Sequence, residues 1–547
     1  MKLSLSMVLS LLLSATGIPA SAQPALTGEW IGGYETNGNY VAMMGRFKAE
    51  SGALSGALDL PQLRETNVAV TQVRSAAPEV HFELPRGNGR LVFEGALSGE
   101  AIAGTIQYGN QRGTFHLVRT VTVDPKVLEH YLGEYQLGPD HYLTVRKTED
   151  FEPFGGIRFS ESDSSSPALR FGKLFPASET AFFAGPARWV PYPVEVNVTF
   201  VGDEQGRAKA LKWKPKGGEE VLARRVTRQT CQEVEVKFTN GTVTLAATMT
   251  LPLTKGPHPA VVLISGSDGY TRMRGLPQFF AEHGIAALSY DKRGKGASTG
   301  DFETATLDDF VGDVSAGVRF LQSRPEIRSK QVGVWGISNG GWIAPCVATR
   351  APDVAFLILH AGPAVTPMAQ GRMELINTMP LRGFTPEEIK QASAYQDLYF
   401  EAMQSDAAYE KLRATYDKVR ASGARWAWNP GPKEALKRQW TRNFNDFDPV
   451  PVLAKVRCPV LAFFGEKDVL VPPEGNVVPM KTALQKGSNE DVTIKVLPGA
   501  NHRFEVAGTG ARDFGTTGKS VSGYYDFMVE WIKKHTPATT DTPRPNR

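Results

Sequence analysis

Residues 332–345 read VGVWGISNGGWIAP, and this stretch decides how the second half of the chain is interpreted. Its centre, Gly336 to Gly340, fits the pattern G-x-S-x-G. A serine in this pattern acts as a nucleophile where a strand precedes it and a helix follows, because the sharp turn lifts the hydroxyl above the sheet. Val332–Trp335 has the composition of a buried strand, and the residues from Gly341 onwards can continue as a helix. The sequence therefore predicts a nucleophile elbow with Ser338 at its tip.

The same pattern occurs a second time at residues 296–300, which read GASTG. The chain contains 54 glycines, so a chance match is expected. Ser298 follows a polar loop and precedes Asp301, and it has neither a strand before it nor a helix after it. We interpret Ser298 as a loop residue and Ser338 as the nucleophile.

A nucleophilic serine needs a general base, and the base needs an acid that orients it. Behind a nucleophile elbow these residues follow in the chain order serine, acid, histidine. His502 lies in a short loop after a late apolar run, which predicts that it is the base. Asp468 is the preferred acid, and Glu466 is its rival, two residues nearer the end of the preceding strand.

The tetrahedral intermediate of acyl transfer needs two backbone N–H donors. The first is expected from Asn339, which follows the nucleophile. The second is expected from Ser267, in the loop SGSDG (265–269) that follows the apolar run Val261–Ile264. Glycines in this loop let the backbone come close to the oxyanion.

The remaining histidines and the cysteines are interpreted as structural. His360 is expected in the core, and His258 and His283 at the surface. The three cysteines (Cys231, Cys346 and Cys458) are far apart and contain no C-x-x-C, so neither a disulfide framework nor a metal site is expected. No cofactor is implied.

Beyond about residue 230, apolar runs alternate with segments of helix length, which predicts a mostly parallel sheet with right-handed crossovers. The runs are Ala260–Ile264, Ile285–Tyr290, Val332–Trp335, Phe356–Leu359, Val460–Phe464 and Val492–Leu497. Residues 366–448 are too long for a simple crossover and contain helical patterns at 386–404, 406–422 and 432–443. An insertion of this size predicts a functional lid. A last helix is expected at 519–535.

Residues 228–538 resemble the α/β-hydrolase superfamily, and within it the exported serine-aminopeptidase, dienelactone-hydrolase-like and carboxylesterase branch. The matching stretches are LISGSDG (263–269), SYDKRGKGASTG (289–300), GISNGGWIAP (336–345), FGEKDVLVP (464–472) and PGANHRF (498–504). The resemblance implies the α/β-hydrolase fold and makes GASTG part of a structural loop near the site. The oxyanion loop reads Ser-Gly-Ser where many relatives have His-Gly.

Residues 23–121 and 122–227 are expected to form two all-β domains, because short alternating runs are separated by turn residues. Both begin with a Gly-Glu-aromatic triplet, at Gly28-Glu29-Trp30 and Gly133-Glu134-Tyr135. The second also carries Tyr-x-Gly-x-Tyr (131–135), Leu-Phe-Pro (174–176) and Gly-x-Ala-x-x-Leu (206–211). In these motifs it resembles the small lipocalin-like domain appended to some exported serine hydrolases.

Residues 1–22 carry the pattern of a secretory signal peptide, with Lys2, an apolar run at Leu3–Leu13 and the cleavage site Ala20-Ser21-Ala22. The run is shorter than the ~20 residues of a membrane span, and no later segment is predicted to span. We expect an exported protein, periplasmic or secreted, with a disordered tail at 539–547. The net charge of +4 is spread along the chain, which gives no case for nucleic-acid binding. The oligomeric state is not indicated.

The predicted reaction is hydrolysis of a small-molecule ester or short peptide through an acyl-enzyme. Aromatic residues of the lid could line an apolar pocket, which favours an ester: Tyr395, Tyr399, Phe400, Trp426, Trp428, Trp440, Phe444 and Phe447. An aminopeptidase, the runner-up, needs carboxylates for a substrate ammonium, and the lid offers Glu374, Glu387, Glu388, Asp397 and Glu401. A binding protein with a degenerate hydrolase domain is a further alternative, against which the complete triad argues.

Overall fold

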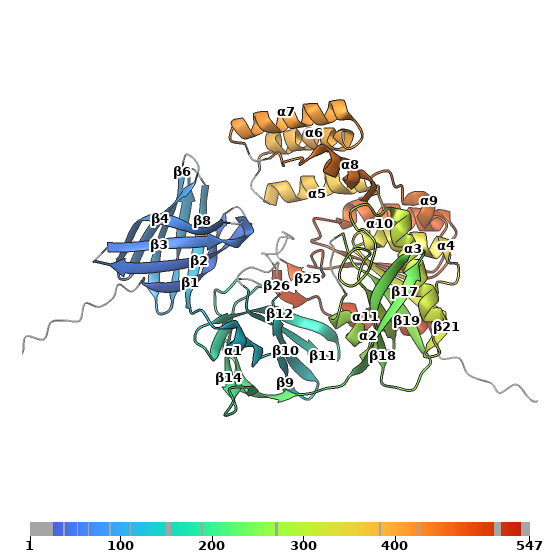
Figure 1. The fold of residues 1–547 in the computed structure, drawn as a ribbon, viewed down its shortest axis with the longest axis horizontal. Coiled ribbons are helices and arrows are strands. Elements are labelled where there is room, and N and C mark those ends of the chain that lie inside the picture. Colours follow the sequence, from blue (N-terminus) through green and yellow to red (C-terminus); the bar gives the residue numbers. More distant parts are fainter. Residues whose placement is uncertain are drawn as a thin grey trace, which may run out of the picture.

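The computed structural model describes residues 26–507 and 516–537, except residues 37–38, 52, 64, 87–88, 110, 149–154, 188–189, 268–271, 382–383, 425 and 443. The predicted signal peptide (1–22) and tail (539–547) lie outside the described residues. The chain builds two β-barrels and then an α/β domain that carries a group of helices (Figure 1).

The first barrel is closed and consists of eight strands that pair antiparallel in sequence order. They are β1 (Gly28–Thr36), β2 (Asn39–Glu50), β3 (Ala53–Leu60), β4 (Glu65–Ala76), β5 (Glu79–Arg86), β6 (Gly89–Ser98), β7 (Ala101–Tyr108) and β8 (Gln111–Thr120), with the short 3₁₀ helix η1 (Pro61–Leu63) after β3. Aromatic rings fill its interior, where Phe82 stacks on Phe93 at 4.5 Å between ring centroids and Phe115 meets both rings edge-on. This barrel therefore has a packed core.

The second barrel follows the short helix α1 (Pro125–Glu129) and repeats the same meander. Its strands are β9 (Gly133–Gly138), β10 (His141–Lys147), β11 (Ile157–Asp163), β12 (Ser166–Pro176), β13 (Ala181–Ala184), β14 (Val196–Gly202), β15 (Ala208–Pro215) and β16 (Val221–Val226). The ring closes because β16 pairs with β9 and β11 pairs with β12. All-β architecture of the N-terminal region is thus confirmed.

The Gly-Glu-aromatic triplets occupy equivalent places in the two barrels. Trp30 donates its indole N–H to the carbonyl of Leu26 at 2.8 Å. Tyr135 donates its hydroxyl to the carbonyl of Tyr131 at 2.7 Å, again four residues back. Buried indole and phenol groups need such partners, and both barrels supply one from the segment that enters the first strand.

An arginine on the last strand of each barrel completes this repeated construction. Arg119 on β8 donates to the carbonyl of Thr27 at 2.6 Å, and its guanidinium lies 4.3 Å from the centre of the indole ring of Trp30. Arg225 on β16 donates to the carbonyl of Leu132. Each arginine ties the entry of the first strand to the closing strand, so the two barrels are built on one plan.

The barrels pack on one another through an apolar cluster. Ile31 and Val118 on the outside of the first barrel contact Phe175 and Phe183 of the second. Beside this cluster the imidazole of His116 stacks on the ring of Tyr192, with 5.4 Å between centroids. The two barrels therefore pack against each other directly.

The C-terminal domain contains an eight-stranded sheet in the order β17-β18-β20-β19-β21-β22-β23-β24. Its strands are β17 (Cys231–Asn240), β18 (Val243–Pro252), β19 (His258–Ile264), β20 (Ala286–Tyr290), β21 (Ile327–Ile337), β22 (Leu357–His360), β23 (Val460–Gly465) and β24 (Val492–Leu497). The pairs from β20–β19 to β23–β24 are parallel, and β17 and β18 pair antiparallel at one edge. The expected mostly parallel sheet is confirmed.

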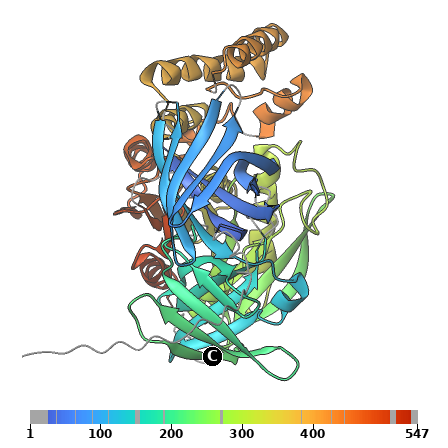
Figure 2. The ribbon, with the colours of Figure 1, turned by 90° about the vertical axis from the view of Figure 1, so that its left-hand side faces the viewer.

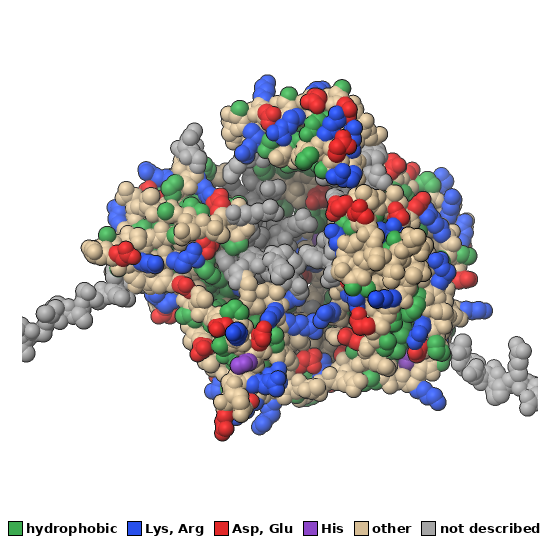
Figure 3. Space-filling model, in the orientation of Figure 1, with side chains coloured by type: hydrophobic (Ala, Val, Ile, Leu, Met, Phe, Trp, Pro, Cys, Tyr) green, Lys and Arg blue, Asp and Glu red, His purple; other side chains and the backbone are tan. Residues whose placement is uncertain are grey.

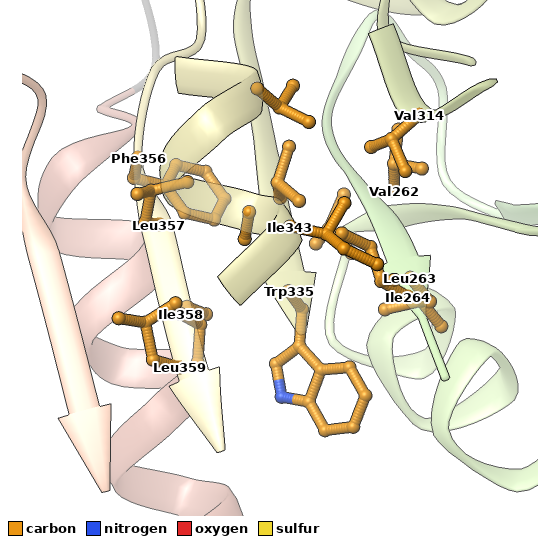
Figure 4. Close-up of a cluster of buried hydrophobic side chains, with 14 of the residues drawn as sticks. Val262, Leu263, Ile264, Val314, Trp335, Ile343, Phe356, Leu357, Ile358 and Leu359 are labelled. Carbon is orange, nitrogen blue, oxygen red and sulfur yellow. The ribbon is translucent and has the colours of Figure 1, made fainter. Parts of the chain in front are cut away.

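Helices cover the sheet on both faces (Figures 1 and 2). They are α2 (Gly275–Glu282), α3 (Leu307–Gln322), α4 (Gly340–Arg350), α9 (Val450–Leu453), α10 (Pro473–Lys486) and α11 (Tyr524–His535). Figure 4 shows how side chains of β19, β21 and β22 pack against Val314 of α3 and Ile343 of α4. Burying this apolar core on both faces fixes the ends of the parallel strands, where the candidate site lies.

Residues 366–448 form four helices at one end of the molecule: α5 (Pro367–Leu381), α6 (Pro386–Ala402), α7 (Asp406–Ala421) and α8 (Lys433–Arg442). Thr385 and Glu388 form the capping box that starts α6. The helical patterns predicted here match α6 to α8, whereas α5 was not anticipated. Figure 3 shows that this face of the molecule is hollowed between these helices, the first barrel and the C-terminal domain.

The end of the chain departs from expectation. The predicted helix at 519–535 begins only at Tyr524, because Thr516–Ser520 form strand β26. This strand pairs with β25 (Glu505–Ala507) and also with β12 of the second barrel, where Arg170 faces Lys519. The sheet of the second barrel therefore continues into the segment that follows His502.

Candidate active site

Ser338 lies between strand β21 and helix α4 and has a φ of 53°. A non-glycine residue in this left-handed region is strained, and such strain is typical of functional turns. A Cβ built on Gly336 would lie 2.4 Å from the carbonyl oxygen of Gly340, so strand and helix approach too closely for any side chain there. The local geometry is that of the expected strand–turn–helix.

Ser298 has a buried hydroxyl that is already engaged on both sides. It donates to the carbonyl of Asp291 at 2.6 Å and accepts from the amide of Ala246 at 2.9 Å. Both bonds tie the GASTG loop to neighbouring backbone. The geometry agrees with the structural role expected for this serine.

Asp468 and His502 lie against each other, with 2.8 Å between Oδ2 of the carboxylate and Nδ1 of the imidazole. The Asp468 side chain is fully buried, whereas the His502 side chain is 18 % exposed. The other carboxylate oxygen, Oδ1, accepts from the amides of Leu470 and Val471, both at 2.9 Å. These bonds fix the carboxylate, and one edge of the imidazole stays accessible.

Glu466, the rival acid, has a different partner. Its Oε2 accepts from the amide of Gly499 at 2.7 Å and so braces the loop that carries His502. Of the two carboxylates, the one that reaches the imidazole is Asp468.

His360 joins the two halves of the site. Its backbone carbonyl accepts from the amide of Ser338 at 2.9 Å, and its Nε2 lies 3.3 Å from the carbonyl oxygen of His502. Its Nδ1 lies 2.8 Å from the hydroxyl of Tyr524, and its ring stacks on Phe504 at 3.7 Å. Burial holds the pKa of His360 well below its usual value, so the ring is neutral.

Sequence reasoning placed His360 in the core but missed that it contacts both Ser338 and His502. The location of His360 at the end of a strand could have indicated this position. It was wrong about His258, which is buried rather than at the surface. The Nε2 of His258 lies 3.0 Å from the carbonyl oxygen of Thr254.

The two residues expected to supply oxyanion donors are Asn339, within the elbow, and Ser267, in the loop of Gly266. Asn339 is the N-cap of α4, directly after Ser338. Gly266 passes close to Ser338, since a Cβ built on it would lie 3.6 Å from the Cβ of Ser338. Ser267 follows Gly266 and is exposed, and Asp268 and Gly269 of the same predicted loop lie outside the described residues.

Within the described part of the chain, no three His, Cys, Asp or Glu side chains come together in a way that could hold a metal ion. The three cysteines are unpaired thiols. No helix among the described residues has the length and apolar character that crossing a membrane requires.

Comparison with known proteins agrees with this architecture. The C-terminal part of the chain belongs to the α/β-hydrolase superfamily. Residues 255–506 match the family described as serine aminopeptidase, S33. This family match takes in the elbow, the carboxylate and the histidine.

Individual relatives are distant. An uncharacterized 31.7 kDa protein of the traX-finO intergenic region of Escherichia coli is 23 % identical over 42 % of this chain and 79 % of its own. Mitochondrial palmitoyl-protein thioesterase ABHD10 of Pongo abelii is 27 % identical over 26 % of this chain and 48 % of its own. The structure of acetyl xylan esterase 1 from Thermoanaerobacterium covers 57 % of this chain and 86 % of its own, with 15 % identity and a TM-score of 0.33.

Proposed function

We propose that this protein is a serine hydrolase that cleaves a carboxylic ester through an acyl-enzyme. One observation carries the proposal. A buried carboxylate, Asp468, orients the imidazole of His502, and both follow a strained serine turn in the chain order expected of the fold. The membership of the C-terminal part in a superfamily of hydrolases supports the same reaction class.

In this mechanism Ser338 attacks the substrate carbonyl while His502 takes the hydroxyl proton. Asp468 holds the imidazole by its Nδ1–H and stabilises the imidazolium that forms. The amides of Asn339 and Ser267 donate to the oxyanion. His502 then returns the proton to the leaving alcohol. In the second half of the reaction water attacks the acyl-enzyme, and His502 takes the proton of the water and returns it to Ser338 as the acid leaves.

Carboxylates of the helical segment favour an ester over a peptide. An aminopeptidase would need acidic groups that remain available for a substrate ammonium. Several of these candidates already have partners, among them Glu387, Glu388 and Asp397. Glu387 accepts from Gln391, Glu388 accepts from the amide of Thr385, and Asp397 pairs with Arg372.

Aromatic residues of the segment give less support for a pocket, because they pack into cores. Tyr395, Tyr399, Phe400, Trp426 and Trp428 belong to the core of the helical segment itself. Phe444 and Phe447 pack into the core of the C-terminal domain. The preference for an ester therefore rests on the carboxylates and on the thioesterase activity named for one relative.

The aminopeptidase alternative is favoured by the description of the matched family. It uses the same triad, so the two reactions differ in the substrate and not in the catalytic groups. A binding protein with a degenerate hydrolase domain is disfavoured, since a degenerate enzyme is expected to have lost one of the three roles.

We propose further that helices α5 to α8 act as a lid over the site and that the second barrel is a lipocalin-like domain. The domain division is then 23–121, 122–227 and 228–538. We also propose that the protein is exported, on the signal-peptide pattern of residues 1–22. The substrate is a small molecule or short peptide.

The test is labelling of the purified protein with a fluorophosphonate, followed by intact-mass measurement and peptide mapping. A single adduct on Ser338 is expected, and esters should then turn over faster than aminoacyl amides. A folded protein that takes no adduct would contradict the proposal and favour a binding role.

A further inference from the structure

Lys292 is a buried lysine outside the triad. It lies in the loop that follows β20, and only 3 % of its surface is exposed. Its ammonium donates to the backbone carbonyl of Gly266. Burying an ammonium is costly unless it is well paired, and the carbonyl of Gly266 is one of the groups that offset this cost for Lys292.

The carbonyl that Lys292 binds belongs to the peptide unit between Gly266 and Ser267. In a trans peptide the C=O and N–H bonds point in opposite directions. Fixing the carbonyl toward Lys292 therefore turns the N–H of Ser267 toward the other side of the loop. Gly266 packs beside Ser338, with 3.6 Å between the Cβ of Ser338 and a Cβ built on Gly266.

The carboxylate next to Lys292 in the chain is occupied by other donors. Asp291 pairs with the guanidinium of Arg272 at 3.1 Å and accepts from the amide of Ala297 at 3.0 Å. Arg272 and Ala297 thereby fix Asp291, the residue that precedes Lys292, and leave the Lys292 ammonium to the carbonyl of Gly266.

We infer that Lys292 is a positioning residue for the oxyanion hole. It holds the Gly266–Ser267 peptide so that the Ser267 N–H faces the oxyanion that forms above Ser338. Its positive charge also polarises this peptide, which strengthens the N–H as a donor when negative charge develops. The inference rests on the proposed acyl-transfer function and adds the residue that orients the second donor.

Lys295 in the same loop provides a matched control. Its ammonium and that of Lys292 lie over the same ring, 4.6 Å and 5.7 Å from the centroid of Phe302. Lys295 pairs with Glu303 at 3.6 Å and is partly exposed. The variants Lys292→Met and Lys295→Met therefore remove the same charge from one loop and differ in the contact with Gly266.

The experiment measures kcat and KM for an aryl ester, together with the inhibition constant of an aryl boronic acid, whose tetrahedral adduct places an oxygen in the oxyanion hole. Lys292→Met is expected to lower kcat by about 10- to 100-fold, somewhat less than loss of a whole donor. KM should change little, and the boronic acid should bind more weakly by a similar factor. Lys292→Arg should recover part of both losses, and Lys295→Met should resemble the wild type.

Equal kcat and equal boronate inhibition in Lys292→Met and the wild type would overturn the inference. If KM and the inhibition constant of the boronic acid rise by the same factor, the inference is also overturned, because that result indicates general damage to binding. If Lys292→Met does not fold, Lys292→Gln is measured in its place with the same criteria. A wild-type protein that neither turns over esters nor takes a fluorophosphonate would instead refute the proposed function itself.

Discussion

The imidazole Nε2 of His360 lies 3.3 Å from the backbone carbonyl oxygen of His502. The backbone carbonyl of His360 also accepts a hydrogen bond from the amide of Ser338. A single buried, neutral histidine thus connects the turn that carries Ser338 with the loop that carries His502. The distance between these two elements is set by packing around His360, and disturbance of either loop is expected to reach the other.

The two serines in G-x-S-x-G patterns should respond differently to substitution. Ser338→Ala is expected to lower kcat by about 10⁴-fold or more, because it removes the proposed nucleophile. Ser298→Ala should leave kcat nearly unchanged but lower the free energy of unfolding by about 1–3 kcal/mol, because the buried amide of Ala246 loses its acceptor. Ester kinetics and urea unfolding of both variants check this. Comparable losses of kcat would contradict the assignment of Ser338.

The acid of the triad can be tested against its rival. Asp468→Asn should reduce kcat by about 10³-fold or more, since a neutral amide no longer stabilises the imidazolium of His502. Glu466→Gln keeps an acceptor for the amide of Gly499 and should have little effect on kcat. Both are measured by ester hydrolysis at saturating substrate. The opposite ranking would make Glu466 the orienting acid.

Acid should destabilise the contact between the two barrels through His116. Burial lowers the pKa of His116 to about 4 from an ordinary value of 6.5, and its Nε2 lies 3.2 Å from the hydroxyl of Tyr40. Because burial disfavours protonation of His116 in the folded protein, this histidine is protonated in the unfolded chain at a higher pH than in the folded one. Stability from this group is complete above pH 6.5, is lost between pH 6.5 and 4, and changes no further below that range.

The loss amounts to roughly 3 kcal/mol when the pKa difference is converted. Urea unfolding at pH 7.5 and 4.5 measures it, with His116→Gln as the variant that lacks the titrating group. The wild type should lose more stability than His116→Gln over this interval. Identical pH dependence in the two proteins would count against a buried, neutral His116.

The sheet of the second barrel extends through β26 to β25, just after His502. A change in the backbone pairing of β26 is therefore expected to affect catalysis. Strand β26 lies between β25 and β12, so a proline within it breaks a ladder. Lys519→Pro is expected to lower kcat by about 10-fold or more, because small displacements of catalytic groups are costly. Lys519→Ala is the control, since the Lys519 side chain is exposed. An active Lys519→Pro enzyme would show that the barrel does not support the loop.

Much of the site could be predicted because its signals are local. The elbow requires glycines within four residues of Ser338, where strand and helix approach closely, and the chain order of Asp468 and His502 follows from the strand order of the sheet. The helix beginning at Pro386 could also be predicted from the sequence, since a capping box spans only four residues. The repeated Gly-Glu-aromatic triplet marked the starts of both barrels for the same reason.

Other features depended on residues distant in the sequence. Nothing local separates Asp468 from Glu466, because both follow the same strand and only the turn geometry directs one carboxylate to His502. Residues 519 and 520 were expected to begin a helix, yet they belong to strand β26 (Thr516–Ser520), which pairs with β12 of another domain.

The sequence by itself therefore determined the class of fold and predicted a nucleophile and the order of the proposed catalytic groups, because these follow from strand and helix periodicity and from the backbone freedom of glycine. The tertiary structure decided which carboxylate meets the histidine, that His360 links the loops of Ser338 and His502, and that Lys292 reaches Gly266. Those contacts join residues 34, 142 and 26 positions apart. Contacts at such separations are fixed by the packing of the sheet and not by any local pattern.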